Sequence, residues 1–307
     1  MSFKISSKNL EFEIALIDIN KLFLHEETIP NLVDEIASSI IQEKIIKNPV
    51  IVDKSSLVVL DGMHRVEAAK KAGCLRMLVC LLDYFNPSIK VGVWYRTFNG
   101  ENLIETLQKK ALQLNLELIE LNFEAAKKAL FNREASTSFL TREKCFSIKW
   151  QENLKKAYEI VKLIESKLVE AGKKVSYETE FDAEKKLLNK AVDMVMATPP
   201  VTKEDVINFA LKGLVFPHKV TRHVIPARPM EINVPLKWLK DESISLEEAN
   251  KLLTEFLSKR EIERIPPGSL FEGRRYEEEI FLFKWKQLWL LPLSFMEAWK
   301  GLLKEKL

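Results

Sequence analysis

The sequence has few cysteines and few glycines, and neither sign of charge dominates it. Three cysteines occur, Cys74, Cys80 and Cys145, and no two of them form a C-x-x-C pair. Neither a disulfide framework nor a zinc site is therefore indicated. The 47 basic and 44 acidic side chains leave a formal net charge of +3. Because no run of like charge is long either, the composition gives no indication of a nucleic-acid-binding surface.

Long hydrophobic runs are missing as well. The N-terminus has no apolar signal core. The most apolar late stretch, residues 280–296, contains Lys284, Lys286 and Pro292, and is too interrupted for a membrane span. We therefore predict a cytoplasmic protein without a membrane partner. Charged residues make up 30% of the chain and are rich in lysine and glutamate, which favours a heat-adapted protein.

Apolar periodicity predicts an α+β fold in three parts. For the first part, residues 1–113, the predicted elements are strands at 11–18, 49–53, 57–60, 77–82 and 90–98 and helices at 30–43, 64–72 and 101–113. Residues 114–240 are predicted to be a second α+β domain, with a hairpin at 137–150 and a long helix at 152–171.

Residues 241–307 are predicted to be a helical extension that serves packing or dimerisation. A capping box at Ser245 opens a helix, and Trp285 and Trp289, like Phe295 and Trp299, are spaced one helical turn apart.

The stretch around Asp61 gives the first indication of chemistry. A β-branched run ends at Asp61 and Gly62, and a helix begins at once with His64 and Arg65 in its first turn. Free backbone N–H groups, the positive end of the helix dipole and an arginine make an anion site. A carboxylate beside such a site suggests a metal that bridges protein and phosphate. The alternative is an ordinary strand-turn-helix with a solvated arginine.

A second unusual segment, residues 216–226, contains two prolines, two histidines and two basic residues. Extended segments held by prolines often carry function, although a plain surface loop gives the same pattern.

Four stretches resemble one known family. The run Asp-Gly-Met-His-Arg at residues 61–65 resembles the D-G-H-H-R signature of the ParB/sulfiredoxin-like superfamily, in particular of its archaeal free serine kinases. Leu-His-Glu at 24–26, the segments 82–85 and 90–95, and residues 219–226 match in family order. The resemblance runs from residue 12 to about residue 240. It implies a ParB/sulfiredoxin-like mixed-sheet domain in the first part of the chain and leaves the extension unmatched.

The resemblance also implies an activity. Members of this family phosphorylate the hydroxyl of free L-serine to O-phospho-L-serine, with ATP or ADP as donor and Mg²⁺ as cofactor. By resemblance, Glu26 is the general base, and Glu27 beside it is expected to raise its pKa by like-charge repulsion. Asp61, His64 and Arg65 are implied as further catalytic residues, with Asp61 at the phosphate and metal site. The other implied site residues are Gly62, Met63, His64 and Arg65 at the phosphates, and Ser39, Trp94, Thr221, Arg222 and His223 at the serine. The last three are expected on a loop, 216–226, that closes over the substrate.

Met63 departs from the family pattern, because the kinases usually carry a histidine there. A thioether offers no N–H to a phosphate, so either His64, Arg65 and the backbone suffice or the preference for the donor differs. The same position holds the cysteine nucleophile of sulfiredoxin. Since methionine cannot form a thiolate, that activity is excluded.

Two alternatives stay open at the level of sequence. One is a kinase of the same fold for another small hydroxylated metabolite, because pocket shape selects the acceptor. The other is a ParB-type nucleotide- or DNA-binding protein, which needs a helix-turn-helix and a basic face that the sequence does not offer. We expect small-molecule substrates, no nucleic acid, and a monomer or homodimer.

Overall fold

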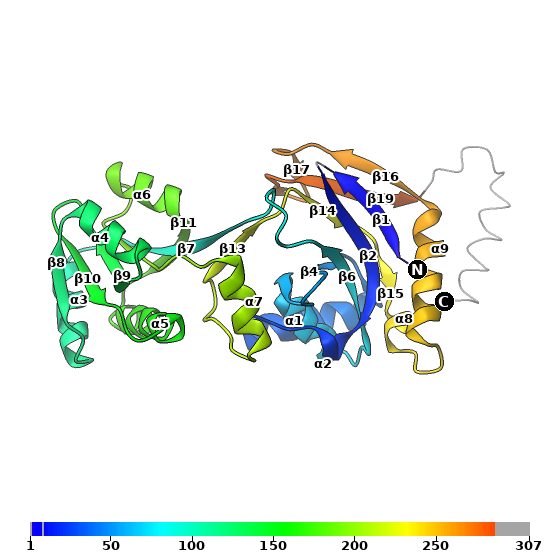
Figure 1. Cartoon of the computed structure of the whole chain (residues 1–307), viewed down its shortest axis with the longest axis horizontal. Helices are drawn as coiled ribbons and strands as arrows, with labels where there is room; N and C mark the ends of the chain where they lie inside the picture. The colour runs from blue at the N-terminus through cyan, green and yellow to red at the C-terminus, as the bar shows by residue number, and fades with distance from the viewer. Residues whose placement is uncertain (1, 8, 286–307) are drawn as a thin grey trace.

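The computed structural model describes residues 2–7 and 9–285. Figure 1 shows two bodies of secondary structure, with strand β7 (Lys90–Phe98) running from one into the other. The α+β fold class predicted from the sequence is confirmed.

The first body is built on a mixed sheet. Within the described residues its five strands have the order β1-β2-β6-β4-β5. Their bounds, in that order, are Phe3–Ser7, Leu10–Asp18, Arg76–Leu82, Val50–Asp53 and Val59–Asp61. β4 runs parallel to β6, whereas the other neighbours are antiparallel. Every residue of β6 is buried, as expected for a central strand covered on both faces.

Two helices that pack on each other, α1 (Pro30–Glu43) and α2 (Met63–Lys71), belong to this body. Pro30 occupies the first turn of α1, where a missing N–H costs little. α2 follows β5 directly, with Gly62 as its N-cap, and Gly73 after its end has the left-handed φ of +78° that the sequence predicts. The predicted strand-turn-helix around Asp61 is confirmed.

The second body holds a seven-stranded sheet within the described residues. Its path is β11-β7-β12-β9-β10-β8, and β13 also pairs with β7. The bounds are β8 Leu118–Leu121, β9 Ala135–Leu140, β10 Cys145–Lys149, β11 Val175–Thr179, β12 Met194–Ala197 and β13 Thr221–Val224. The helices of this part are α3 Leu103–Gln113, α4 Phe123–Phe131, α5 Leu154–Glu170, α6 Glu180–Leu188 and α7 Lys203–Leu211. The predicted hairpin is β9–β10 and the predicted long helix is α5.

Strand β7 links the two bodies. Its first half, Lys90–Val93, pairs with β13, and its second half pairs with β11 and β12. β7 therefore belongs to the second sheet, whereas apolar periodicity predicted it as part of residues 1–113. Residues 221–224 are strand β13 rather than part of a loop. The strand partners lie far apart in the chain, so local patterns could not reveal these pairings.

The structure corrects the predicted helical extension. Helix α9 (Leu246–Ser258) forms behind its capping box, but strands follow it. These are β16 Arg260–Ile265, β17 Leu270–Phe271, β18 Arg274–Arg275 and β19 Glu279–Trp285. β19 pairs with β16 and, in parallel, with β14 (Ala227–Met230). The run 279–285 is short and rich in aromatic and β-branched residues, a composition that favours a strand. The helical spacing of Trp285 and Trp289 had favoured a helix there instead. Trp289, Phe295 and Trp299 lie outside the described residues.

The extension packs on the first sheet. The side-chain amide of Asn250 in α9 accepts a hydrogen bond from the Leu16 N–H at 2.8 Å and donates one to the Leu16 carbonyl at 3.0 Å. Arg76 donates to the carbonyls of Trp238 and Asp241. Four short elements remain among the described residues: the 3-10 helix η1 (Ile19–Lys21), helix α8 (Leu236–Lys240), and strands β3 (Ile45–Ile46) and β15 (Val234–Pro235), which pair with each other.

In the described part of the chain, the three cysteines are buried and free. No helix there combines the length and the apolar character that crossing a membrane requires.

Candidate active site

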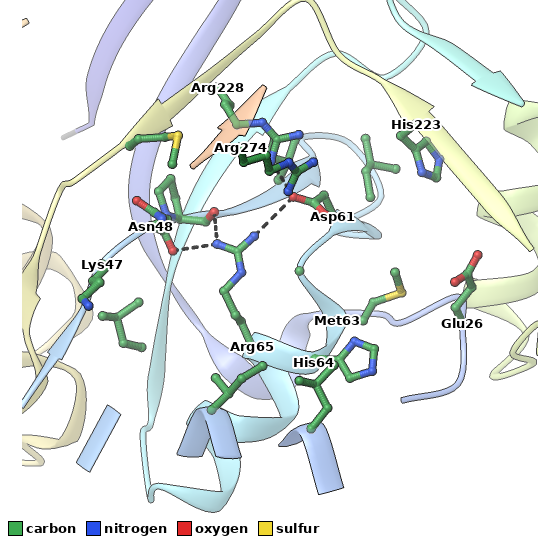
Figure 2. A pocket seen from close by; sticks show the side chains of 18 of the residues that line it. Glu26, Lys47, Asn48, Asp61, Met63, His64, Arg65, His223, Arg228 and Arg274 are labelled. Carbon is green, nitrogen blue, oxygen red and sulfur yellow. Dashed lines mark hydrogen bonds and ion pairs between the residues drawn. The ribbon is translucent and has the colours of Figure 1, made fainter. Parts of the chain in front are cut away.

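One cleft brings the residues predicted from the sequence together (Figure 2). It has a volume of about 830 Å³, and its walls come from α1, the turn that opens α2, Trp94 of β7, residues 218–223 and the C-terminal extension. The eleven predicted residues that line it are Glu26, Ser39, Asp61, Gly62, Met63, His64, Arg65, Trp94, Thr221, Arg222 and His223.

The turn at Gly62 opens α2 into this cleft. Gly62 has a φ of +101°, and a Cβ added there would lie 2.6 Å from Val50 Cγ1 and 2.7 Å from Arg65 Nη2. A side chain at this position would therefore strain the backbone and collide with its neighbours. No side chain among the described residues caps α2. The first N–H groups of the helix, together with its dipole, are thus available to an anion.

Asp61 lies between two arginines that are far apart in the sequence. Its Oδ2 is 3.3 Å from Arg65 Nη2 and 3.1 Å from Arg228 Nη1. Burial opposes ionisation of Asp61, but the two arginines outweigh it and hold the pKa of the carboxyl below its usual range. Asp61 is therefore an anion at neutral pH. Arg65 Nη1 also donates to the carbonyls of Asn48 and Pro49, at 2.9 and 2.7 Å, which fixes the segment before β4.

Glu26 is a buried carboxyl group at the other end of the cleft. Only 7% of the residue is exposed, and its Oε1 accepts hydrogen bonds from the Thr221 backbone N–H and, at 2.6 Å, from Thr221 Oγ1. Burial raises the pKa of Glu26 more than these bonds lower it. The expected cause, repulsion by Glu27, is not the one found. Glu27 instead pairs with Lys162 Nζ at 2.7 Å.

His25 shares the Thr221 hydroxyl with Glu26. Its Nδ1 is 2.8 Å from the Val59 carbonyl oxygen and its Nε2 is 2.9 Å from Thr221 Oγ1. Burial lowers the pKa of His25 to about 4, so the ring is neutral. Because a carbonyl only accepts, Nδ1 carries the proton and Nε2 is an acceptor. The single hydroxyl proton of Thr221 thus faces two acceptors. When Glu26 gains a proton it becomes the weaker acceptor, and the hydroxyl can turn to His25.

His223 and Arg222 continue this wall of the cleft. His223 Nε2 is 2.8 Å from the Tyr84 hydroxyl. Burial, and then the neighbouring His25, lower the pKa of His223 well below its usual value. Arg222 Nε is buried without a hydrogen-bond partner in the described structure, and no described carboxylate pairs with its guanidinium. A buried, unsatisfied donor on a cation favours an anionic ligand.

Trp94 and Ser39 also line the cleft. The Lys219 ammonium lies 5.1 Å from the centre of the Trp94 ring, a cation–π contact that holds both side chains. Ser39 Oγ donates to Glu43 Oε1 at 2.8 Å on the exposed face of α1.

His64 is also held in one protonation state. Its Nε2 accepts the Ile29 N–H at 3.0 Å, which leaves Nδ1–H as the donor of the ring. Burial and then Lys219 lower the pKa of His64. Figure 2 shows the Met63 side chain directed toward the Glu26 end of the pocket.

Several cleft residues were not predicted from the sequence. His25 lies within a matched motif, so its role could have been suspected from the motif alone. Arg228 follows the matched stretch by two residues, and Arg274 and Tyr276 belong to the extension. No local pattern marks these last three, because packing of distant segments brings them to the cleft.

Comparison with known proteins agrees with this geometry. The chain is 30% identical over 236 residues to an ATP-dependent L-serine kinase of Staphylothermus marinus, which covers 74% of the chain and 92% of the relative. It is 29% identical over 244 residues to the ADP-dependent L-serine kinase SerK of Thermococcus kodakarensis, covering 77% and 96%. A solved free serine kinase variant in complex with AMP superimposes with a TM-score of 0.65 at 28% identity, covering 77% of this chain and 97% of that one. No family model matches the chain.

The fold and the cleft define a phosphotransferase of the ParB/sulfiredoxin-like superfamily that acts on a hydroxyl group. Within that class, the chain belongs to the family of L-serine kinases. The resemblance inferred from the sequence motifs is confirmed.

Proposed function

We propose that this protein transfers a phosphoryl group from an adenine nucleotide to the hydroxyl of free L-serine and forms O-phospho-L-serine. One observation carries the proposal. A buried carboxyl group with a raised pKa, Glu26, faces the same cleft as the uncapped N-terminus of α2, where Asp61 is held between Arg65 and Arg228. A proton acceptor and a phosphate site in one cleft are the two parts that phosphoryl transfer to an alcohol needs.

Glu26 is the proton acceptor in this mechanism. The serine oxygen attacks the terminal phosphorus, the bond from that phosphorus to the nucleotide oxygen breaks, and the serine proton passes to Glu26. Its raised pKa makes Glu26 a better base, provided that it is ionised at the working pH. The Thr221 hydroxyl holds the carboxylate in place, and it can turn to His25 once Glu26 is protonated.

The turn at 61–65 is the phosphate site. The N–H groups of α2 and His64 Nδ1–H are the donors for phosphate oxygens. Hydrogen bonds to the carbonyls of Asn48 and Pro49 hold the Arg65 guanidinium in a fixed position beside them. Asp61 fits a Mg²⁺ ion carried by the donor phosphates, because Mg²⁺ is commonly bound through one or two carboxylates plus phosphate oxygens. Such an ion would neutralise charge on the transferring group.

The serine is proposed to lie between Glu26 and the wall formed by Arg222 and Trp94. The unpaired Arg222 guanidinium suits the substrate carboxylate or the transferring phosphate. His223, with Nε2 bound to Tyr84, is a buried support for this wall. Ser39 remains a candidate substrate contact, although its hydroxyl is engaged with Glu43 in this structure.

The phosphoryl donor is ATP or ADP, since one relative is ATP-dependent and another is ADP-dependent. The test is to incubate the protein and Mg²⁺ with each nucleotide and a panel of serine, threonine, homoserine and polyols. We expect O-phosphoserine from serine, detected by mass spectrometry, and its loss with EDTA. Phosphorylation of another acceptor in preference to serine would contradict the proposed substrate.

A further inference from the structure

The C-terminal extension reaches the cleft through the hairpin β17–β18 and Tyr276. The sequence resemblance ends near residue 240, and the Staphylothermus relative matches 92% of its own length but only 74% of this chain. The extension is nevertheless not confined to the outside of the fold, because Arg274 and Tyr276 line the same cleft as Asp61 and Arg65.

Sheet pairing fixes this part of the extension beside Arg228. β19 runs parallel to β14, with Arg228 opposite Ile280. The Tyr276 N–H donates to the Ser269 carbonyl at 3.0 Å, and its carbonyl accepts from the Gly268 N–H at 2.7 Å. The Tyr276 residue is only 8% exposed. The hairpin is therefore held by backbone hydrogen bonds and by a buried aromatic ring.

The Tyr276 ring is in cation–π contact with two arginines. The Arg274 guanidinium carbon is 4.8 Å from the centre of the ring, and that of Arg228 is 6.0 Å from it. Figure 2 shows Arg228 and Arg274 on the same side of the pocket, both directed toward Asp61. The ring thus holds Arg274 at the cleft by a cation–π contact.

The three arginines at this end of the cleft differ in their partners. Arg65 pairs with Asp61, and Arg228 pairs with both Asp61 and Glu278. In the part of the chain that the structure describes, no carboxylate lies within ion-pair distance of Arg274. Its neighbour Arg275 pairs instead with Glu277 at 3.1 Å and does not line the cleft. Arg274 is thus a cation without a protein counter-ion next to the phosphate site.

We propose that Arg274, held by Tyr276, binds phosphate oxygens of the donor nucleotide, so that the extension is a wall of the donor site as well as a packing element. Guanidinium–phosphate pairs are strong and geometrically specific. This inference rests on the proposed function for the identity of the ligand. It assigns a binding role to residues outside the part of the chain that resembles the family.

The test compares Arg274→Ala with Arg275→Ala, a matched change of the adjacent arginine. Dissociation constants for ATP and ADP are measured by titration calorimetry with Mg²⁺. We expect Arg274→Ala to weaken both nucleotides about tenfold, the scale of one charge-assisted contact. Arg275→Ala should stay within about twofold of wild type, and Arg274→Lys should be intermediate because the charge remains. The KM for serine should not change in any of them.

The outcomes separate the two proposals. Unchanged nucleotide affinity in Arg274→Ala, or an equal loss in Arg275→Ala, would overturn the subsite even if wild type phosphorylates serine. Weakened nucleotide binding confined to Arg274→Ala, in a protein that makes no phosphoserine, would support the subsite and contradict the proposed substrate. Thermal melts of both variants control for folding, and a selective loss of affinity at equal Tm supports the subsite.

Discussion

The Glu26 carboxylate and the Thr221 hydroxyl are 195 residues apart in the sequence and 2.6 Å apart in the structure. This contact crosses the cleft wall between the segment before α1 and strand β13. It holds the proposed base in place, and it connects that base to His25 through a hydroxyl with a single proton.

Replacing Glu26 should remove activity while leaving the fold intact. Glu26→Gln keeps the size and one acceptor oxygen but cannot take the serine proton, so turnover should fall by roughly two orders of magnitude or more. Nucleotide affinity should persist, because the phosphate site lies at the other end of the cleft. Glu27→Gln is the matched control, since Glu27 pairs with Lys162 instead. Near-normal phosphoserine formation by Glu26→Gln would remove Glu26 from the role of base.

Removing the Thr221 hydroxyl should shift the pH profile. That hydroxyl lowers the pKa of Glu26 by donating to its carboxylate, so Thr221→Val should raise this pKa further. The acidic limb of kcat/KM, where Glu26 becomes protonated, should then move to higher pH. Thr221→Ser keeps the hydroxyl and should restore the wild-type limb. If Thr221→Val lowers kcat but leaves the acidic limb of the kcat/KM profile at the same pH, the Thr221 hydroxyl has a purely structural role.

Acid should destabilise the protein through His25. The pKa of His25 is about 4 in the folded protein against 6.5 for an unperturbed histidine, so the unfolded chain binds the proton more readily. Its contribution to stability is therefore complete above pH 6.5 and is lost as the pH falls toward 4, up to about 3 kcal/mol. Urea unfolding at pH 5 and pH 8 should show this loss in wild type. A His25→Gln variant with the same pH dependence would contradict the assignment.

A methyl group at Gly62 should damage the phosphate site. In Gly62→Ala the added methyl group lies on a residue with a positive φ and within 3 Å of neighbouring atoms. The variant should therefore be about 1 kcal/mol or more less stable, and it should bind nucleotide more weakly. Gly100→Ala is the control, since Gly100 also has a positive φ, +122°, but no atom lies within 4 Å of an added Cβ. Equal nucleotide affinity in the two variants would show that the close packing around Gly62 does not matter for nucleotide binding.

Removing Arg222 should slow phosphoryl transfer. Its unpaired guanidinium is proposed to neutralise an anionic ligand group, so Arg222→Ala should lower kcat/KM for serine by about 10²- to 10³-fold. Arg142→Ala, which removes a surface pair with Asp193, should have little effect. Unchanged kcat and KM in Arg222→Ala would exclude this residue from the site.

Much of the site could be predicted from the sequence, because its chemistry is local. Asp61, Gly62 and the first turn of α2 are adjacent in the chain, so a strand that ends at Asp-Gly before a helix already indicates a candidate anion site. The Glu26 motif and residues 221–223 were found by resemblance, and the fold brings both to the same cleft. The thiol chemistry of the sulfiredoxins was excluded by one side chain, Met63.

How these parts act on one another depends on long-range packing in the folded chain. Burial, rather than the neighbouring Glu27, raises the pKa of Glu26, because desolvation depends on everything packed around a group. The partner of Asp61, Arg228, comes from β14, whose place is set by parallel pairing with β19 in the extension. The same pairing brings Arg274 and Tyr276 to the cleft that Asp61 lines. The chemical groups and the local turn that presents them follow directly from the order of residues in the chain. Long-range packing determined their charge states, their partners and the last wall of the site, because these depend on contacts between residues far apart in the chain.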